Sequence, residues 1–151
     1  MNKKIIIGLA LLTAPILLTG CGSKKTLTCV SQQSSSGPTE NTTATLVYEG
    51  KTMKSGEVVY TFDFSNIITD DSQYEVLKQQ KYCDSMVPQL KLTNKSMADG
   101  IGECTEKWDN KTLNITINLD AEALSKKDNF KGIDNAKKEF ETGNAMKCEI
   151  K

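Results

Sequence analysis

The chain has 151 residues, and its 19 lysines balance 19 acidic residues, so that the formal charge is zero. It contains neither arginine nor histidine. Nucleic-acid binding calls for a basic, usually arginine-bearing face, and histidine is the usual general base and the commonest metal ligand. The composition therefore argues against a nucleic-acid partner and against histidine-based catalysis.

Residues 1–21 have the pattern of a bacterial lipoprotein signal. Lys3 and Lys4 give a positive start, residues 5–18 form an apolar run, and residues 18–21 (LTGC) supply a cleavage site directly before a cysteine. The run of 14 residues is shorter than the roughly 20 that a transmembrane helix needs. We expect residues 1–20 to be removed and Cys21 to carry diacylglycerol and a further acyl chain such as palmitate. The protein is then expected at the cell membrane, lipid-anchored on its extracytoplasmic side.

The expected mature chain is a short tether followed by one domain. It has 131 residues and, with 17 lysines against 19 acidic residues, a formal charge of −2. Residues 21–25 form the lipidated tether, which spans at most about 18 Å when extended. Residues 26–151 suit a single globular domain, which should lie close to the bilayer.

Lipidation of Cys21 leaves an even set of four cysteines. Outside the cytoplasm, four cysteines suggest two disulfides, with three possible connectivities. Cys29 and Cys148 lie near the two ends of the domain in strand-like runs, so we pair them, and we pair Cys83 on a helix stripe with Cys104 in a strand. Four buried free thiols remain the alternative. Metal binding is less favoured, because the spacings of 54, 21 and 44 residues contain no C-x-x-C.

The first half of the domain is predicted to consist mainly of strands. Residues 26–32 favour a first strand, and residues 31–43, which are rich in Ser, Thr, Gly and Pro, are typical of a loop. Apolar and polar residues alternate over residues 44–48, which favours a second strand. Residues 49–56, with two glycines, favour a turn.

The clearest strand signal is a row of apolar residues on one face of residues 58–65. The row consists of Val58, Tyr60, Phe62 and Phe64. Such a row is most simply the core side of a sheet. The alternative is that Tyr60, Phe62 and Phe64 line a binding site for a small apolar ligand.

A helix is predicted from Asp70 and Asp71 to about Met86. The acidic pair suits the N-cap and first turn, where the helix dipole favours negative charge, and capping explains it more simply than a metal site. An apolar stripe should face the core: Val76, Cys83, Val87 and Leu90. Pro88 is expected to end or kink this helix.

The second half is predicted to add a hairpin, a helix and a last strand. Residues 101–108 and 112–119 form the hairpin, and residues 121–127 a short helical turn. A helix over residues 134–142 should bury Ile133, Ala136 and Phe140, with Gly143 as its C′ residue. Met146, Cys148 and Ile150 would form the last strand. The fold class is therefore α+β, with a mostly antiparallel sheet of about five to six strands packed by one longer and one shorter helix.

Motifs for catalysis are missing from the sequence. There is no G-x-G-x-x-G, Walker loop, H-E-x-x-H, G-x-S-x-G or S-x-x-K. We therefore expect no enzyme activity, no catalytic residues, no metal and no cofactor.

Several short runs follow one another in a recognisable order. They are the lipobox before Cys21, the TLTC run ending at Cys29, residues 60–64 (YTFDF), residues 113–120 (LNITINLD), and residues 135–143 (NAKKEFETG) before Cys148. This order resembles the small YehR-like bacterial lipoproteins, whose function is not known. The resemblance implies a lipid-anchored, single-domain envelope protein with a sheet packed on helices. It carries over no catalytic residue, and the pairing of Cys83 with Cys104 has no counterpart in it.

Two functions of different kinds follow from these observations. The preferred one is a non-enzymatic lipoprotein that binds another envelope component, a protein or a glycan, through the outer face of the sheet or the Ser/Thr-rich segment. The alternative is a carrier of a small apolar ligand held between the helix and the aromatic row of Tyr60, Phe62 and Phe64.

Overall fold

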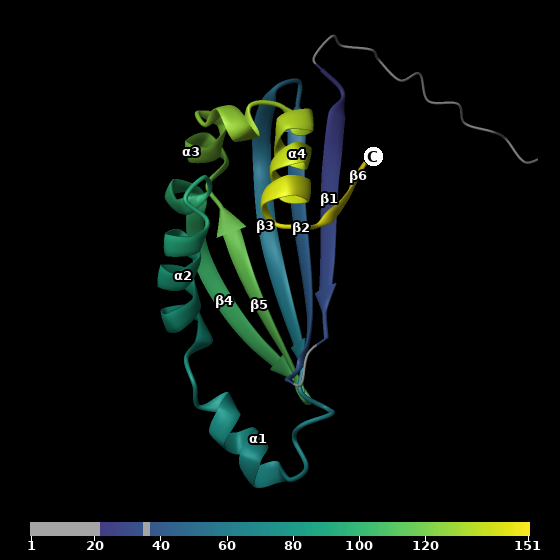
Figure 1. The fold of residues 1–151 in the computed structure, drawn as a ribbon. Coiled ribbons are helices and arrows are strands. Elements are labelled where there is room, and N and C mark those ends of the chain that lie inside the picture. Colours follow the sequence, from purple (N-terminus) through teal and green to yellow (C-terminus); the bar gives the residue numbers. More distant parts are fainter. Residues whose placement is uncertain (1–21, 35–36) are drawn as a thin grey trace, which may run out of the picture.

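One antiparallel sheet forms the body of the domain, and the helices cover one of its faces (Figure 1). The computed structural model describes residues 22–34 and 37–151, so the expected signal and Cys21 lie outside the described residues. The elements are β1 (Lys24–Gln33), β2 (Thr39–Glu49), β3 (Thr52–Asp63), α1 (Asp71–Lys78), α2 (Tyr82–Thr93), η1 (Ala98–Gly100), β4 (Ile101–Asp109), β5 (Thr112–Leu119), α3 (Ala121–Ser125), η2 (Asp128–Phe130), α4 (Ile133–Gly143) and β6 (Lys147–Ile150).

The sheet has the strand order β4-β5-β3-β2-β1-β6, and every neighbouring pair is antiparallel. This confirms the predicted α+β class and the predicted mostly antiparallel sheet of about five to six strands. The last strand returns to the first, and the backbones of Thr26 and Lys151 exchange hydrogen bonds of 2.8 and 2.9 Å. Because β6 pairs only with residues 27–30 of β1, it leaves the edge of β1 open beyond Val30 among the described residues.

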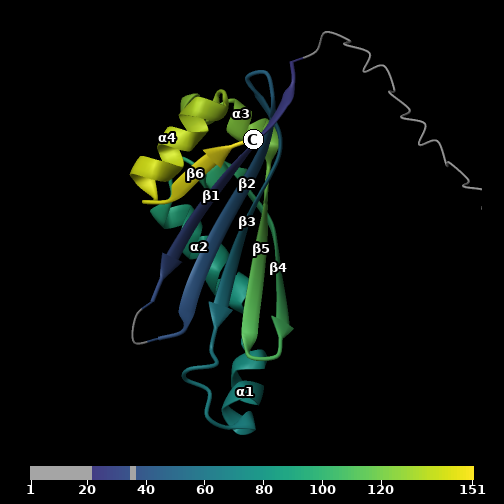
Figure 2. The same ribbon diagram turned by 90° about the vertical axis from the view of Figure 1, so that its right-hand side faces the viewer.

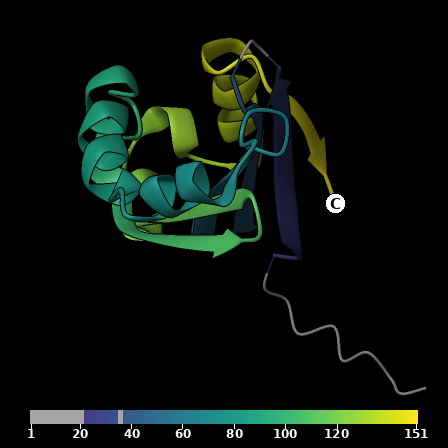
Figure 3. The same ribbon diagram turned by 90° about the horizontal axis from the view of Figure 1, so that it is seen from below.

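The two faces of the sheet differ in chemistry because the strands alternate. On the helix-covered face, β5 buries Leu113, Ile115, Ile117 and Leu119. The residues between them, such as Asn114 and Thr116, lie on the uncovered face. Figures 2 and 3 show all the helices on one side of the curved sheet.

The helix-covered core is tightest beneath η2 and α4. The Tyr48 hydroxyl donates a 2.9 Å hydrogen bond to the carbonyl of Phe130, and the Phe130 ring meets Phe140 of α4 edge to face at 6.2 Å. Tyr48, Phe130 and Phe140 are at most 2% exposed. Burial raises the pKa of Tyr48 far above its usual value, so the phenol remains a hydrogen-bond donor. These contacts hold α4 against the sheet.

Two disulfides join distant parts of the chain, and they are the two pairings predicted from the sequence. Cys29 of β1 is bonded to Cys148, its partner in the register with β6. Cys83 in the first turn of α2 is bonded to Cys104 of β4. Glu106, two residues further along β4, accepts a 2.9 Å hydrogen bond from the backbone N–H of Cys83. The start of α2 is thus fixed to the edge strand by a covalent bond and a cap.

The predicted loop over residues 31–43 and the predicted turn over residues 49–56 are both wrong in extent. Strand β1 continues to Gln33 and β2 begins at Thr39, while the second connection is reduced to Gly50 and Lys51. The Thr residues of these two segments suit a pleated surface. Strand pairing between β2 and its two neighbours supplies the backbone partners, which a sequence pattern does not reveal. Gly50 supplies the left-handed turn residue, with φ +60°.

The single helix predicted to run to Met86 is in fact two helices, α1 and α2. The chain breaks at residues 79–81 because the start of α2 is set by Cys83 and its partners on β4. Pro88 lies inside α2 rather than at its end. Pro88 has no N–H to donate to the carbonyl one turn earlier in the helix. Because Pro88 is exposed, water can bond that carbonyl instead. Val76 was predicted on one apolar stripe with Cys83, but it is 61% exposed. Because the chain breaks between α1 and α2, Val76 and Cys83 do not share a helix face.

The C-terminal predictions hold except at the end of the helix and at Met146, which was predicted in the last strand but precedes β6. Ile133, Ala136 and Phe140 are buried as expected. Gly143 is not the C′ residue, because α4 includes it and the left-handed conformation falls on Ala145 (φ 51°). Within the described part of the chain, no helix has the length and apolar character needed to cross a membrane.

Candidate functional site

A cleft of about 150 Å³ opens on the helix-covered face, between α2 and α4. Figure 1 shows α2 beside the edge strand β4 and α4 in front of β2 and β3. The described residues that line the cleft come from five strands and from the two helices with their following loops: Ser31, Gln33, Glu40, Thr42, Val58, Tyr60, Leu90, Asn94, Met97, Ile101, Ile117, Leu119, Phe140, Asn144 and Met146. Segments more than 100 residues apart therefore meet at one site.

The floor of the cleft is apolar and belongs to the alternating strands. Val58 and Tyr60 of β3 lie beside Ile117 and Leu119 of β5, and all four side chains face the helices. Val58 and Ile117 are at most 4% exposed. The floor is part of the core and should be rigid.

The two walls are linked to each other at the end of α2. Leu90 and Asn94 form one wall, and Phe140 of α4 forms the other. Between the walls, the hydroxyl of Ser96 donates a 2.6 Å hydrogen bond to Glu139 of α4. The second oxygen of Glu139 accepts a 2.9 Å bond from the Asn129 amide. This link sets the separation of α2 and α4 at one end of the cleft.

The polar groups of the cleft gather towards the free edge of β1. Ser31 and Gln33 of β1, with Thr42 of β2 and Asn144 after α4, also border a second hollow that runs along this edge. This edge is free because β6 stops pairing at Val30. The cleft therefore opens past β6 and has an apolar inner part and a polar mouth.

The electrostatics of the cleft are set by one carboxylate and one phenol. Of the described lining residues, Glu40 alone is charged, and it accepts a 3.3 Å hydrogen bond from Thr42. Burial, with a smaller contribution from Glu40, raises the pKa of Tyr60 to about 12. The phenol thus stays protonated at neutral pH and can donate a hydrogen bond. Within the cleft, Glu40 favours a neutral or positively charged group over an anion.

The three residues predicted to bind a ligand do not act as one row. Tyr60 lines the cleft, whereas Phe62 and Phe64 do not. Instead they belong to a group that we call the aromatic cluster: Phe62, Phe64, Tyr74, Tyr82 and Trp108. The ring centroids of Phe64 and Trp108 lie 5.4 Å apart, as do those of Tyr74 and Trp108. Strand β3 brings Tyr60 and Phe62 to the helix-covered face, as predicted. Different helices cover the two ends of β3, so the aromatic residues do not share one site.

The remaining predicted residues have structural places. Asp70 caps α1 and accepts a 3.0 Å hydrogen bond from the backbone of Gln73. Residues 22–34 and 37–151 contain no group of three His, Cys, Asp or Glu side chains placed to hold a metal.

The sequence did not identify the walls or the mouth of the cleft. Asn94, Met97 and Asn144 lie in connections, where no periodic pattern marks them. Gln33 and Glu40 fall in the segment predicted to be a loop. One signal for the cleft was available in the sequence: Asn94 and Asn144 are two amide side chains that each directly follow a helix.

Comparisons with known proteins identify no family for this chain. No family model matches the chain, and no curated protein matches it. A solved structure described as the NMR structure of the protein from Streptococcus pneumoniae TIGR4 aligns over 99% of this chain and 98% of that one, with a TM-score of 0.42 and 16% identity. The resemblance to YehR-like lipoproteins stays a prediction.

Proposed function

We propose that this protein is a lipid-anchored binding protein of the cell envelope, not an enzyme, and that its binding site is the cleft between α2 and α4. The signal pattern ending at Cys21 supports the anchor and the extracytoplasmic location. The observation that carries the binding function is the cleft itself, with a largely apolar floor and most of its polar groups at its mouth. Ligand sites in proteins typically combine these two properties.

The size of the cleft limits the apolar part of the ligand. An apolar cavity of about 150 Å³ accommodates a molecule the size of benzene, which is well short of a long acyl chain. We therefore refine the carrier hypothesis to a ligand with one ring or a short branched aliphatic group. Its other end carries an amine or a hydroxyl that reaches Glu40 and the hydroxyl of Tyr60, which projects from the floor.

The test compares two probes that differ in charge but share a ring. Benzylamine and benzoate are titrated into the isotope-labelled protein, and backbone chemical shifts are followed by NMR. We expect saturable shifts at Tyr60, Ile117 and Phe140, with tighter binding of benzylamine. Glu40→Gln should reduce the preference for benzylamine, because it removes the one charge that lines the cleft.

Glu57→Gln is the matched control for this test. Glu57 lies on the same strand as Tyr60 but is exposed on the opposite face, so the change alters the net charge equally and leaves the cleft untouched. Absence of saturable shifts at the cleft with both probes would contradict the binding site. A preference for benzylamine that survives in Glu40→Gln would contradict the role of the carboxylate.

The anchor is tested separately in cells. Cys21→Ala should release the protein from the membrane fraction, and mass spectrometry of the natural protein should find the acyl chains on Cys21. If Cys21→Ala remains membrane-bound after removal of the signal, the proposed lipid attachment is wrong.

A second candidate function is binding of an envelope protein or glycan to the uncovered face of the sheet. It is favoured by one observation: this face bears hydroxyl and amide groups side by side, and Thr61 donates a 2.9 Å hydrogen bond to Asn114 across β3 and β5. Such groups hydrogen-bond readily to sugars. Cross-linking in intact cells from this face would identify a partner. Failure to capture one specific partner under any growth condition would contradict it.

A further inference from the structure

Three separate segments meet at the end of the sheet where β1 begins. They are the start of β1, the β2–β3 turn and the start of α4. A side chain on Gly22 would lie 3.1 Å from the backbone nitrogen of Gly50, and one on Gly132 would lie 3.9 Å from the Lys51 side chain. Lys25, Lys51 and Lys131 line one hollow there. We call these three lysines the basic end.

The basic end is not neutralised within the protein. All three lysines are exposed, and none makes an ion pair with a described residue, unlike the neighbouring Lys54, which pairs with Glu49 at 3.3 Å. Asp134 is the acidic residue among those lining the hollow. The excess of positive charge at this end contrasts with the charge of −2 of the whole mature chain.

The position of the proposed anchor decides which partner this charge meets. The described chain begins at Gly22, and the next residue towards the N-terminus is Cys21. The inference rests on the proposed lipid attachment at Cys21, which brings this end of the domain to the bilayer. We infer that Lys25, Lys51 and Lys131 dock on the anionic headgroups of that membrane. Each lysine close to an anionic surface strengthens attraction about fivefold.

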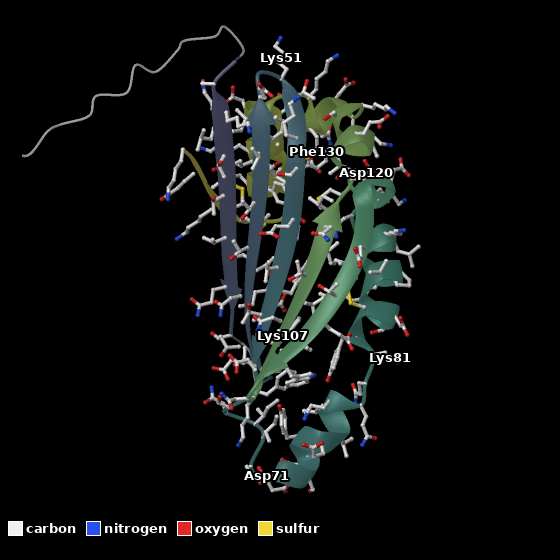
Figure 4. All side chains as sticks on the ribbon, turned by 180° about the vertical axis from the view of Figure 1, so that it is seen from behind. Lys51, Asp71, Lys81, Lys107, Asp120 and Phe130 are labelled. Atoms are coloured by element: carbon white, nitrogen blue, oxygen red, sulfur yellow. A yellow bond between two sulfur atoms is a disulfide. The ribbon has the colours of Figure 1, made fainter. Side chains whose placement is uncertain are left out.

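Docking at the basic end fixes the orientation of the domain. Figure 4 shows Lys51 at one end of the long sheet and Asp71 at the other. Strand β1 extends from Lys25 to Gln33 at the mouth of the cleft, and at about 3.3 Å per residue this places the mouth roughly 26 Å from the membrane-facing end. The cleft then takes its ligand from the aqueous envelope space, not from the bilayer.

The experiment uses the mature chain attached to lipid nanodiscs through Cys21. The other four cysteines are in disulfides, so a maleimide lipid reacts with Cys21 alone, whether or not cells acylate it. The nanodiscs contain phosphatidylcholine with or without phosphatidylglycerol and a headgroup spin label. Because the tether alone keeps this end near the bilayer, we expect weak relaxation enhancement of the amides of Gly50, Lys51 and Gly132 in neutral nanodiscs. We expect a much larger enhancement of the same amides with phosphatidylglycerol, and none at Asp71.

Substitutions separate local docking from net charge. Lys25→Gln, Lys51→Gln and Lys131→Gln together should lower the ratio of docked to undocked protein about 100-fold. The control, Lys81→Gln, Lys91→Gln and Lys107→Gln, removes the same charge from exposed sites elsewhere and should keep the enhancement. Equal enhancement in neutral nanodiscs, at both ends of the domain, or in the triple variant of the basic end would overturn the inference. Native acylation is judged separately from the mass of Cys21, so the failure of one proposal is distinguishable from the failure of the other.

Discussion

Two parts of the domain differ in how deeply their side chains are buried. One lies beneath α3, α4 and η2, and the other surrounds α1. In the first, which we call the α4 half, Leu27, Tyr48 and Phe130 are at most 1% exposed. In the second, the α1 half, α1 itself buries no residue. The Tyr82 hydroxyl and the Trp108 indole N–H are buried there without a hydrogen-bond partner among the described residues.

This difference teaches that stability is not uniform along the sheet. Segments with few buried apolar contacts open at lower free energy than the core, so the α1 half should open first. The cleft lies between the two halves. Its α4 wall belongs to the stable half, whereas its α2 wall continues into the less stable one through residues 79–81. We expect the α2 wall to be the one that adjusts to a ligand.

The largest expected effect on the free energy of unfolding comes from removing each disulfide in turn. The Cys29–Cys148 bond spans 119 residues and lies in the α4 half, whereas Cys83–Cys104 spans 21. In the chain-entropy model these loops contribute about 5 and about 3 kcal/mol to the free energy of unfolding. Guanidinium unfolding of the double variants Cys29→Ala/Cys148→Ala and Cys83→Ala/Cys104→Ala should show this order. The reverse order would contradict the expectation that the longer closed loop gives the larger contribution.

The next effect compares one apolar side chain from each half. Phe130→Ala should lower the free energy of unfolding by about 3 to 5 kcal/mol, because it leaves a cavity beside Phe140. Val76→Ala on the exposed face of α1 should change it by less than about 0.5 kcal/mol. The two values can be measured by the same denaturant titration. Similar losses from both variants would mean that Val76 is buried and that the two halves do not differ.

A smaller effect distinguishes two tyrosine hydroxyls. Tyr48→Phe removes the hydrogen bond to the Phe130 carbonyl and leaves a buried acceptor unpaired, which costs about 1 to 3 kcal/mol. Tyr82→Phe removes a hydroxyl that lacks a partner among the described residues, and it should leave the stability unchanged or raise it. Thermal unfolding of both variants gives the comparison. A loss in Tyr82→Phe as large as in Tyr48→Phe would show that the Tyr82 hydroxyl is paired in solution.

The smallest effect is a pH dependence confined to α1. Hydrogen bonds from the Ser72 side chain and the Gln73 backbone hold the pKa of Asp70 below its usual range. A lowered pKa means that this capping contribution is complete above the usual carboxyl pKa and is lost as pH falls through the lowered one. The protection factors of the α1 amides, which correct for the intrinsic pH dependence of exchange, should therefore fall in acid, and Asp70→Asn should remove that fall.

Asp71→Asn is the control for the capping aspartate. It is the neighbouring carboxyl and leaves the bonds from Ser72 and Gln73 to Asp70 in place, so the pH response of α1 should persist. If the pH response disappears in Asp71→Asn and persists in Asp70→Asn, the carboxylate that caps α1 is Asp71 and the assignment to Asp70 is wrong.

Local sequence patterns predicted the faces of the sheet better than the ends of its elements. Leu113, Ile115 and Ile117 alternate strictly and are all buried, because a period of two is a local property of a strand. The lengths of β1 and β2 depend on pairing between segments, which no local pattern encodes. The division into α1 and α2 likewise depends on Cys83 and its contacts with a strand about 20 residues later.

The candidate site was predictable only in its floor. Tyr60 was selected for its aromatic ring and its place on the inner face, and it lines the cleft. Phe62 and Phe64 satisfied the same criterion but lie among the rings of Tyr74, Tyr82 and Trp108. A strand pattern specifies which way a side chain points, whereas the helix that covers it determines whether a space remains above it.

The bond between Cys29 and Cys148 also governs how the domain would carry mechanical load. If the membrane holds the chain at Cys21, a pull from a bound partner passes to the bilayer through β1, which lies between β2 and β6. Hydrogen bonds of antiparallel strands run perpendicular to the strands, so a force along β1 shears many of them at once and does not open them one by one. The disulfide prevents β1 from sliding past β6. The first strand is thus a strong point of attachment for a domain that is tethered at that end.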